Sequence, residues 1–241
     1  MIEIKQLTCR YADKTILRDV DLKIDDHLTI LGSNGSGKST LAKALCNLIE
    51  YHGKIKLNGK DIKELSFEEI AKDIAYIPAK LEIYDHYITV LEFVLLGRFI
   101  YKKSFFDYSK EDQDIAVKNL RFLGVEYLSD HLVTSLSSGE TALVLIAQAL
   151  SQESRIIIFD EPSANLDPHN SKIIANHIKD LKRSHQIILI THDLHLASYI
   201  DSPVVFIKEQ STFYFKSDFF ITENLRRLYN VDFESLAVKY E

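Results

Sequence analysis

The pattern of apolar and polar positions alternates between strand-type and helix-type segments. Ile2–Leu7 and Val20–Ile24 place apolar and polar residues in turn, as half-exposed strands do. Other runs are continuously apolar and read as strands of a buried sheet. Further strand signals lie at Leu28–Leu31, Arg155–Asp160, Gln186–Thr191, Val204–Ile207 and Thr212–Phe215. Strands alternating with helices predict an α/β fold with a mostly parallel central sheet.

The middle of the chain, residues 80–150, is helical in pattern. Val90–Leu96 is the first helical stretch, and Ser109 with Asp112 forms a capping pair for a helix that runs to about Leu123. Another helix opens at Gly139. Helices are also predicted at Ser39–Ile49 and Glu223–Tyr229. We therefore expect a helical insert within an α/β domain.

Composition narrows the class of protein. A chain of 241 residues accommodates one large α/β domain or two small ones. Its net charge of −6 argues against a general nucleic-acid binder, which needs surplus Lys and Arg. Cys9 and Cys46, the only two cysteines, lack the spacing of a disulfide framework or a zinc site.

No segment has the pattern of a signal peptide or a membrane span. Met1–Gln6 lacks a long apolar core. The most apolar stretch, Ile88–Tyr101, is too short to span a bilayer and contains Glu92 and Arg98. We expect a cytoplasmic protein that reaches a membrane only through a partner.

A glycine-rich segment carries the clearest chemistry. Residues 32–39 read GSNGSGKS and fit GxxxxGK[ST] at every fixed position, between a predicted strand and a predicted helix. In such a P-loop, backbone N–H groups surround the phosphates, Lys38 reaches the β- and γ-phosphates, and the Ser39 hydroxyl ligates Mg²⁺. The predicted ATP site comprises Gly32, Ser33, Asn34, Gly35, Ser36, Gly37, Lys38, Ser39 and Thr40.

Two carboxylates complete the expected phosphate chemistry. Asp160 ends an apolar strand, which places it at the edge of the sheet where ligands bind. It is the second candidate ligand for Mg²⁺. Glu161 follows directly and is the candidate general base for the attacking water. By itself an Asp-Glu pair could be an ordinary polar strand end, but the P-loop favours the functional interpretation.

Four further segments make the sequence resemble the ABC ATPase family. Residues 136–140 (LSSGE) resemble the family signature LSGGQ, and residues 161–168 (EPSANLDP) resemble the segment EPTSALDP. Thr191-His192-Asp193 resembles the switch-histidine segment. Tyr11 stands where the family places an aromatic residue that stacks on adenine.

The resemblance implies a P-loop NTPase (RecA-like) core, with an antiparallel β part near the N-terminus and an inserted helical subdomain. We expect residues 1–79 and 151–241 to form the ATP-binding core and residues 80–150 the helical subdomain. It also implies a homodimer in which each P-loop faces the partner's signature. In such a dimer His192 contacts the γ-phosphate or the attacking water. The remaining ligand-binding residues implied are Ser137, Ser138, Gly139 and Asp167 of the D-loop.

Two assignments have structural alternatives. Tyr11 could be an ordinary strand aromatic, although stacking on a base stabilises a complex by about 1–3 kcal/mol. His192 and His195 have a helical spacing that could suggest a metal site, but no further ligand is apparent in the sequence.

Some segments are similar to one branch of the family. Residues 88–98, 191–197 and 222–229 resemble importers of iron-siderophore, haem, cobalamin and related metal complexes. This implies two copies bound to two membrane permease subunits at the inner face of the membrane, with an external substrate-binding protein selecting cargo. The alternatives are a low-turnover regulatory ATPase, a non-transport ABC ATPase acting on DNA or ribosomes, and a subunit of an importer or exporter of unrelated cargo.

Three positions depart from the family pattern. Ala79 stands where a glutamine usually touches Mg²⁺ and water, Ser138 replaces a signature glycine, and Glu140 replaces the common glutamine. A methyl group can neither ligate a metal nor orient water. We therefore expect an active ATPase of modest turnover.

Overall fold

A computed structural model describes residues 1–81, 85–102 and 108–230. The chain folds into two compact units. Unit 1 comprises Met1–Ser66, Ile158–Glu161 and the described residues from Gln186 onward. Unit 2 comprises Phe67–Ile157 and Pro162–His185. Each unit therefore gathers stretches that are far apart in the sequence.

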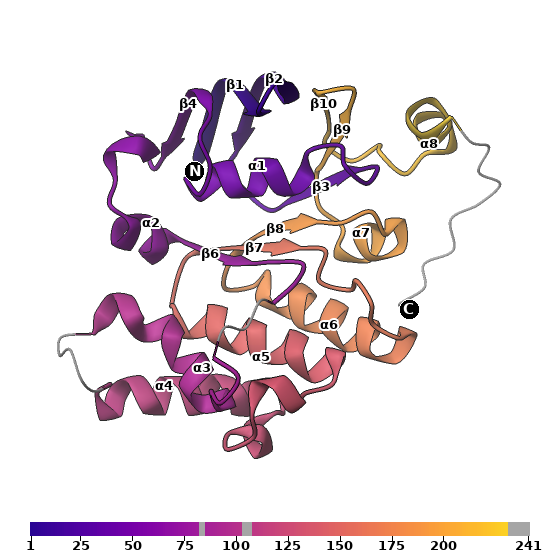
Figure 1. Ribbon diagram of the computed structural model, residues 1–241. Helices are drawn as coiled ribbons and strands as arrows, with labels where there is room; N and C mark the ends of the chain where they lie inside the picture. Colours follow the sequence, from indigo (N-terminus) through magenta and orange to yellow (C-terminus); the bar gives the residue numbers. More distant parts are fainter. Residues whose placement is uncertain (82–84, 103–107, 231–241) are drawn as a thin grey trace. The chain divides into compact units, whose positions relative to one another are not determined.

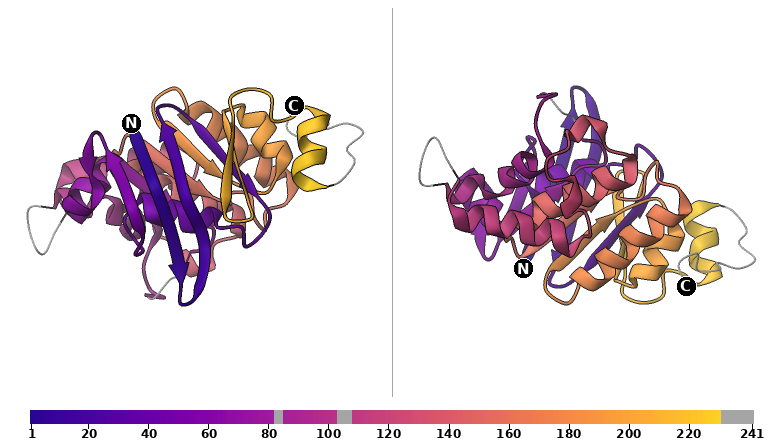
Figure 2. Two further views of the ribbon diagram at one scale, coloured as in Figure 1. Left: turned by 90° about the horizontal axis from the view of Figure 1, so that it is seen from above. Right: turned by 90° about the horizontal axis from the view of Figure 1, so that it is seen from below.

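Unit 1 contains an antiparallel sheet at the N-terminus. Its strand order is β2-β1-β4-β5, and β1 pairs with both β2 and β4, for example Ile4 with Leu22 and with Ile55. In β1 the buried side chains alternate at Ile2 and Ile4 and again at Leu7 and Cys9, with a register shift between the two pairs. The long strands β1 and β2 run side by side in Figure 2. The strands are β1 (Ile2–Tyr11), β2 (Lys14–Ile24), β4 (His52–Leu57) and β5 (Lys60–Asp61).

A second sheet supplies the buried strands of unit 1. Its order is β10-β9-β3-β8 followed by the end of β7, with β3 parallel to β8 and β9, and β10 antiparallel to β9. The strands are β3 (Leu28–Gly32), β7 (Ile156–Asp160), β8 (Gln186–Ile190), β9 (Val204–Lys208) and β10 (Ser211–Phe215). The predicted α/β class with parallel strands is confirmed, as is the antiparallel part near the N-terminus.

Three helices accompany these sheets. Helix α1 (Lys38–Leu45) lies between the antiparallel sheet and β3 in Figure 1. It ends four residues before the predicted Ile49, because the chain turns at Asn47, whose φ of 54° is left-handed. Helices α7 (Leu194–Ile200) and α8 (Thr222–Tyr229) follow β8 and β10. Leu225 and Leu228 of α8 pack in the cluster that contains Phe206, so this helix contributes to the core of unit 1.

Unit 2 is largely helical in its described residues, and its bounds are wider than the residues 80–150 expected to form a helical subdomain. Helices α3, α4 and α5 pack against one another (Figure 1). Three of its helices begin with a capping box, including Ser109 with Asp112, the pair identified in the sequence. The elements are α2 (Phe67–Asp73), β6 (Ile74–Ile77), α3 (Val90–Leu95), α4 (Lys110–Phe122), α5 (Ser138–Ser151) and α6 (Pro168–Leu181).

Arg98 lies inside unit 2 and joins three of its segments. Its Nε donates to Asp112 at 2.9 Å, and Nη1 donates to the carbonyl of Ser151 at 2.8 Å and to Glu153 at 2.6 Å. The guanidinium also lies over the ring of Tyr101. Arg98 and Asp112 are only 5% and 6% exposed, so the ion pair is shielded from water.

The helices in the described part of the chain were also compared with the length and apolar character of a membrane span. None of them reaches both.

Candidate nucleotide site

The P-loop connects β3 to α1 within unit 1. A turn is closed where the N–H of Ser36 donates to the carbonyl of Ser33 at 3.1 Å. Gly37 caps the helix with φ 107°, and a Cβ there would lie 3.0 Å from Ile16 and from Leu17. This position therefore requires glycine, both for its backbone angle and for the lack of space. Thr40 lies in the first turn of α1 and is largely buried.

The side chain of Lys38 folds back onto the backbone of the P-loop. Its side chain is 6% exposed, and its Nζ donates to the carbonyls of Gly32 at 3.0 Å and Ser33 at 3.2 Å. The same Nζ lies 3.3 Å from Oε1 of Glu161. A buried ammonium needs such partners, because its isolated charge would be costly to desolvate. A phosphate that binds the loop can take the place of the carboxylate.

Ser39 and Asp160 provide neighbouring oxygen ligands. The Ser39 hydroxyl donates to Oδ1 of Asp160 at 3.0 Å, although the two residues are 121 positions apart in the chain. Asp160 is 2% exposed and ends β7. A hydroxyl beside a carboxylate, next to a phosphate loop, is a donor set suited to Mg²⁺. The two residues predicted to hold the metal therefore lie together.

Glu161 contacts both the P-loop lysine and the histidine segment. Its backbone φ is 52°, an uncommon left-handed angle for a non-glycine residue, and its N–H donates to the carbonyl of Ile190 at 2.8 Å. Oε2 accepts from the His192 backbone N–H at 3.2 Å and lies 2.8 Å from Nδ1 of His192. A left-handed residue with such fixed partners is typical of a functional site.

A cavity of about 390 Å³ adjoins the P-loop. Ser33–Ser36 form one side of it, β2 contributes Lys14–Ile16, and the β9–β10 turn contributes Lys208–Gln210. The Ser36 hydroxyl is buried and forms no hydrogen bond with any described residue. Tyr11 ends β1, is 51% exposed and is not among the residues that line this cavity. Its stacking role remains a prediction.

Sequence reasoning missed the β9–β10 turn as a neighbour of the P-loop. The N–H of Arg18 donates to the carbonyl of Gln210 at 3.0 Å, which brings the turn against β2. A Cβ on Gly32 would lie 2.7 Å from the carbonyl oxygen of Ile207. No local pattern in the sequence predicts this contact, because the P-loop and the β9–β10 turn are about 175 residues apart in the chain.

The signature and D-loop residues belong to unit 2. Ser137 caps α5 and exchanges hydrogen bonds with Glu140, and these bonds hold the pKa of the Glu140 carboxyl below its usual range. Asp167 caps α6, where bonds from Asn170 lower its pKa. Ser138 is exposed, whereas Gly139 is buried against the side chain of Asn170.

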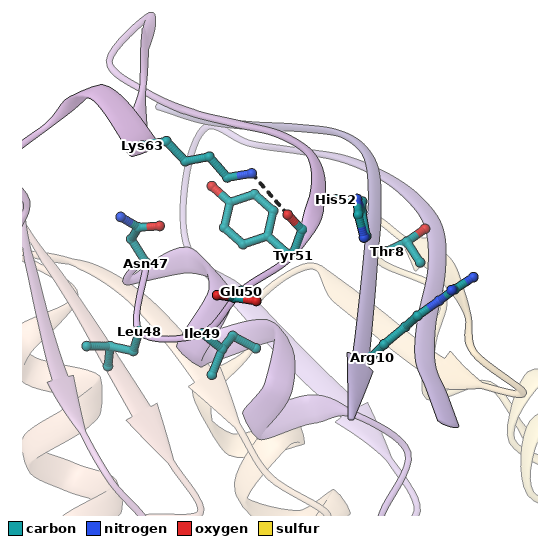
Figure 3. Close-up of a pocket in the computed structure, with 9 residues that line it drawn as sticks. All are labelled: Thr8, Arg10, Asn47, Leu48, Ile49, Glu50, Tyr51, His52 and Lys63. Atoms are coloured by element: carbon teal, nitrogen blue, oxygen red, sulfur yellow. Dashed lines mark hydrogen bonds between the residues drawn. The ribbon is translucent and has the colours of Figure 1, made fainter. Parts of the chain in front are cut away.

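A larger cavity of about 630 Å³ lies elsewhere in unit 1, beyond the P-loop residues (Figure 3). Lys63 extends over the ring of Tyr51 and donates to its carbonyl oxygen at 3.0 Å. Arg10 points away from both residues in Figure 3, and Glu50 adds a carboxylate. The cationic groups thus do not converge on one point, so the geometry does not favour a second phosphate site. The lining residues are Thr8, Arg10, Asn47, Leu48, Ile49, Glu50, Tyr51, His52 and Lys63.

His192 and His195 have the spacing that could suggest a metal site. Residues 1–81, 85–102 and 108–230 contain no group of three or more His, Cys, Asp or Glu side chains placed to hold a metal ion. His192 is instead engaged with Glu161, and His195 lies in the first turn of α7.

Comparisons with known proteins settle the family. A family model described as ABC transporter matches residues 17–164, more than half of the chain. The chain belongs to this family. It is 32% identical over 217 residues to the achromobactin transport ATP-binding protein CbrD of Dickeya dadantii, covering 88% of this chain and 80% of that protein. It is an ATP-binding subunit of the ABC type and an ATPase.

Two further matches agree. The chain is 31% identical over 213 residues to the iron(3+)-hydroxamate import ATP-binding protein FhuC of Bacillus subtilis, covering 86% of this chain and 79% of that protein. A solved structure of a metal-chelate type ABC transporter in an inward-facing conformation superposes with a TM-score of 0.83 at 25% identity. This match covers 96% of this ABC ATPase and 89% of the other chain. The predicted family, fold and ATPase activity are thereby confirmed.

Proposed function

We propose that unit 1 binds Mg²⁺-ATP at the P-loop and hydrolyses it there. The observation that carries the proposal is the convergence of Lys38, Ser39, Asp160, Glu161 and His192 within one compact unit. Lys38 binds the β- and γ-phosphates, and Ser39 with Asp160 holds Mg²⁺, which offsets phosphate charge when bound. The N–H groups of residues 33–40 surround the phosphates.

Glu161 acts on the attacking water. Binding of the γ-phosphate moves Lys38 from the carboxylate to the phosphate and leaves Oε1 free to accept a proton from water. His192 lies 2.8 Å from Oε2, and we expect it to contact the γ-phosphate or the water. The cavity beside the P-loop leaves room for the ribose and base, with Ile16 among its lining residues. Tyr11, outside that lining, is the proposed stacking partner of the base.

Two copies of the chain are proposed to close around two ATP molecules. In each seam Ser137, Ser138 and Gly139 of one copy face the γ-phosphate bound by the other, and Asp167 lies in the D-loop. The support is local: Ser137 and Gly139 stand at the N-terminus of α5, where backbone N–H groups and the helix dipole favour an anion. Closure on binding and opening after hydrolysis drive the cycle.

The work of this cycle is proposed to be the import of a metal complex. The relatives named for achromobactin transport and iron(3+)-hydroxamate import support this cargo class, as does the likeness to a metal-chelate type transporter. Two permease subunits span the membrane, and an external binding protein selects the cargo. The ATPase itself sits at the inner face of the membrane through the permease and binds no nucleic acid.

The first test replaces the proposed base. Glu161→Gln removes the carboxylate that would accept a proton from water, while the side chain keeps its size and shape. We therefore expect loss of steady-state hydrolysis with retention of bound ATP. The matched control is Glu64→Gln, an exposed glutamate of unit 1 away from the P-loop, which should keep normal turnover. Normal hydrolysis by Glu161→Gln would exclude Glu161 as the base.

The second test identifies the partner. Gentle detergent purification from native cells should recover a polytopic permease in near-equal amount, and deletion of the gene should abolish uptake of a ferric chelate. Recovery of ribosomal proteins, of DNA-bound factors or of no membrane partner would contradict the transport role. Normal chelate uptake without the protein would contradict the cargo class alone.

A further inference from the structure

The hydroxyl of the signature serine is already used within its own chain. Ser137 Oγ donates to Oε2 of Glu140 at 2.7 Å, and the Ser137 backbone N–H donates to the same oxygen at 2.8 Å. In return the N–H of Glu140 donates to Ser137 Oγ at 3.3 Å. A serine hydroxyl has one hydrogen to donate. In this arrangement that hydrogen points to the carboxylate and is not available to a phosphate oxygen.

The chemistry of residue 140 decides where this hydrogen goes. An ionised carboxylate can only accept, and charge-assisted hydrogen bonds of this kind are about twice as strong as neutral ones. A glutamine amide can accept the Ser137 N–H through its oxygen and donate to Ser137 Oγ through its NH₂ group. The serine hydrogen would then be free for a phosphate. Tyr127 further holds the carboxylate, since its hydroxyl lies 3.3 Å from Oε1.

We propose that Glu140 is a positioning residue that weakens the binding of ATP across the dimer seam by holding the hydroxyl of Ser137. The proposal rests on the proposed function, in which Ser137 faces a γ-phosphate bound by a second copy. Glu140 acts in two ways: it occupies the only hydrogen of the hydroxyl, and it places a negative charge beside the surface that receives the phosphate. The effect is a requirement for more ATP before the dimer closes.

Unit 2 contains a matched control for this arrangement. Thr89 and Glu92 form the same capping box at α3, with distances of 2.8, 2.7 and 3.3 Å for the three corresponding bonds. Glu92→Gln therefore makes the same chemical change at a helix start that carries none of the signature residues. A change in helix capping alone should affect both variants alike.

The experiment measures ATP-dependent dimerisation of the full chain. The parent carries Glu161→Gln so that ATP is retained, and light scattering after gel filtration gives the ATP concentration at half-maximal dimer. Adding Glu140→Gln should lower this concentration about tenfold, which corresponds to about 1.4 kcal/mol. Glu92→Gln should leave it unchanged. Affinity for ADP, which uses the P-loop of one chain, should be equal in all variants.

A double-mutant cycle with Ser137→Ala tests the route of the effect. Without the hydroxyl, Glu140→Gln should no longer tighten the dimer. Equal ATP requirements in the parent and in Glu140→Gln would overturn the role of Glu140 while leaving the dimer intact. A gain that persists with Ser137→Ala would show that the hydroxyl is not the intermediary. Absence of dimers in every variant would instead overturn the proposed function, and the role of Glu140 with it.

Discussion

The buried ion pair of Arg98 and Asp112 allows a quantitative test of unit 2, which carries the signature helix. Replacing Arg98 by Met keeps most of the side-chain volume but removes the charge. Asp112 would then be left as a carboxylate that is only 6% exposed, with bonds from Ser109 as its remaining support. The carbonyl of Ser151 would also lose a donor.

The magnitude follows from burial. Removing one partner of a buried pair costs about 3–5 kcal/mol, and the bonds from Ser109 place Asp112 at the lower end, about 3 kcal/mol. The lost ion pair with Glu153 adds little to the cost of Arg98→Met, because the Glu153 side chain is 52% exposed and water screens its charge. Arg121 and Glu126 form an exposed two-bond pair at 2.7 Å, so Arg121→Met should lower the free energy of unfolding far less than Arg98→Met does.

The assay is urea unfolding followed by far-UV circular dichroism, since the chain contains no tryptophan to report by fluorescence. Arg98→Met/Asp112→Asn removes the stranded charge and should recover at least about 1 kcal/mol relative to Arg98→Met. Equal losses in Arg98→Met and Arg121→Met would refute the reasoning. So would a double variant less stable than Arg98→Met alone.

The same pair predicts a pH dependence. Burial raises the pKa of Asp112, but the bonds from Ser109 and Arg98 outweigh this and bring the pKa below its usual value. The folded pKa is thus lower than that of the unfolded chain, about 3.9. The stabilisation is complete above that value and is lost as the pH falls through the lower folded pKa. Asp112→Asn should show a smaller loss of stability across this acid range.

Two further predictions concern residues near the proposed chemistry. Ala79→Gln restores a side chain that can contact Mg²⁺ and water, so steady-state ATP turnover should rise by about threefold or more. A threefold rise corresponds to an activation barrier lower by about 0.7 kcal/mol. An unchanged or lower rate would favour another explanation for Ala79. Gly139→Ala places a Cβ 2.6 Å from Cγ of Asn170, so the end of that side chain must move, and unit 2 should be destabilised by less than about 1 kcal/mol in urea unfolding. Adding Asn170→Ala should restore part of that loss, and failure to do so would refute the steric explanation.

Much of the fold and of the site was predictable because the signals are local. The P-loop glycines, Lys38 and Ser39 occupy fixed positions in one short segment, and Ser109 with Asp112 marks a helix start by spacing alone. The apolar strand before Asp160 placed that carboxylate at the edge of the sheet. The spacing of apolar residues and the capping of helices depend on residues close together in the chain, so both can be read directly from the sequence.

The rest depended on contacts between distant segments. Arg98 was predicted only to interrupt an apolar stretch, whereas the structure gives it a buried carboxylate fourteen positions away. The strand at His52–Leu57 was missed because only Ile55 and Leu57 in it are apolar. Its strand conformation depends on pairing with β1. The β9–β10 turn beside the P-loop was likewise invisible. Tertiary pairing, rather than local preference, fixes these features.

The path of the chain has a mechanical consequence for the carboxylates of Asp160 and Glu161. Only Ile158–Glu161 of the middle of the chain belongs to unit 1, and the backbone leaves for unit 2 on both sides of this four-residue stretch. Its attachments in unit 1 include the bond from Ser39 to Asp160 and the bond from the Glu161 N–H to Ile190. A pull on the segment after Glu161 therefore acts directly on Glu161, and a pull on the segment before Ile158 acts on β7, which ends at Asp160. Movement of the helical unit would therefore act on the proposed ATP site through the backbone itself.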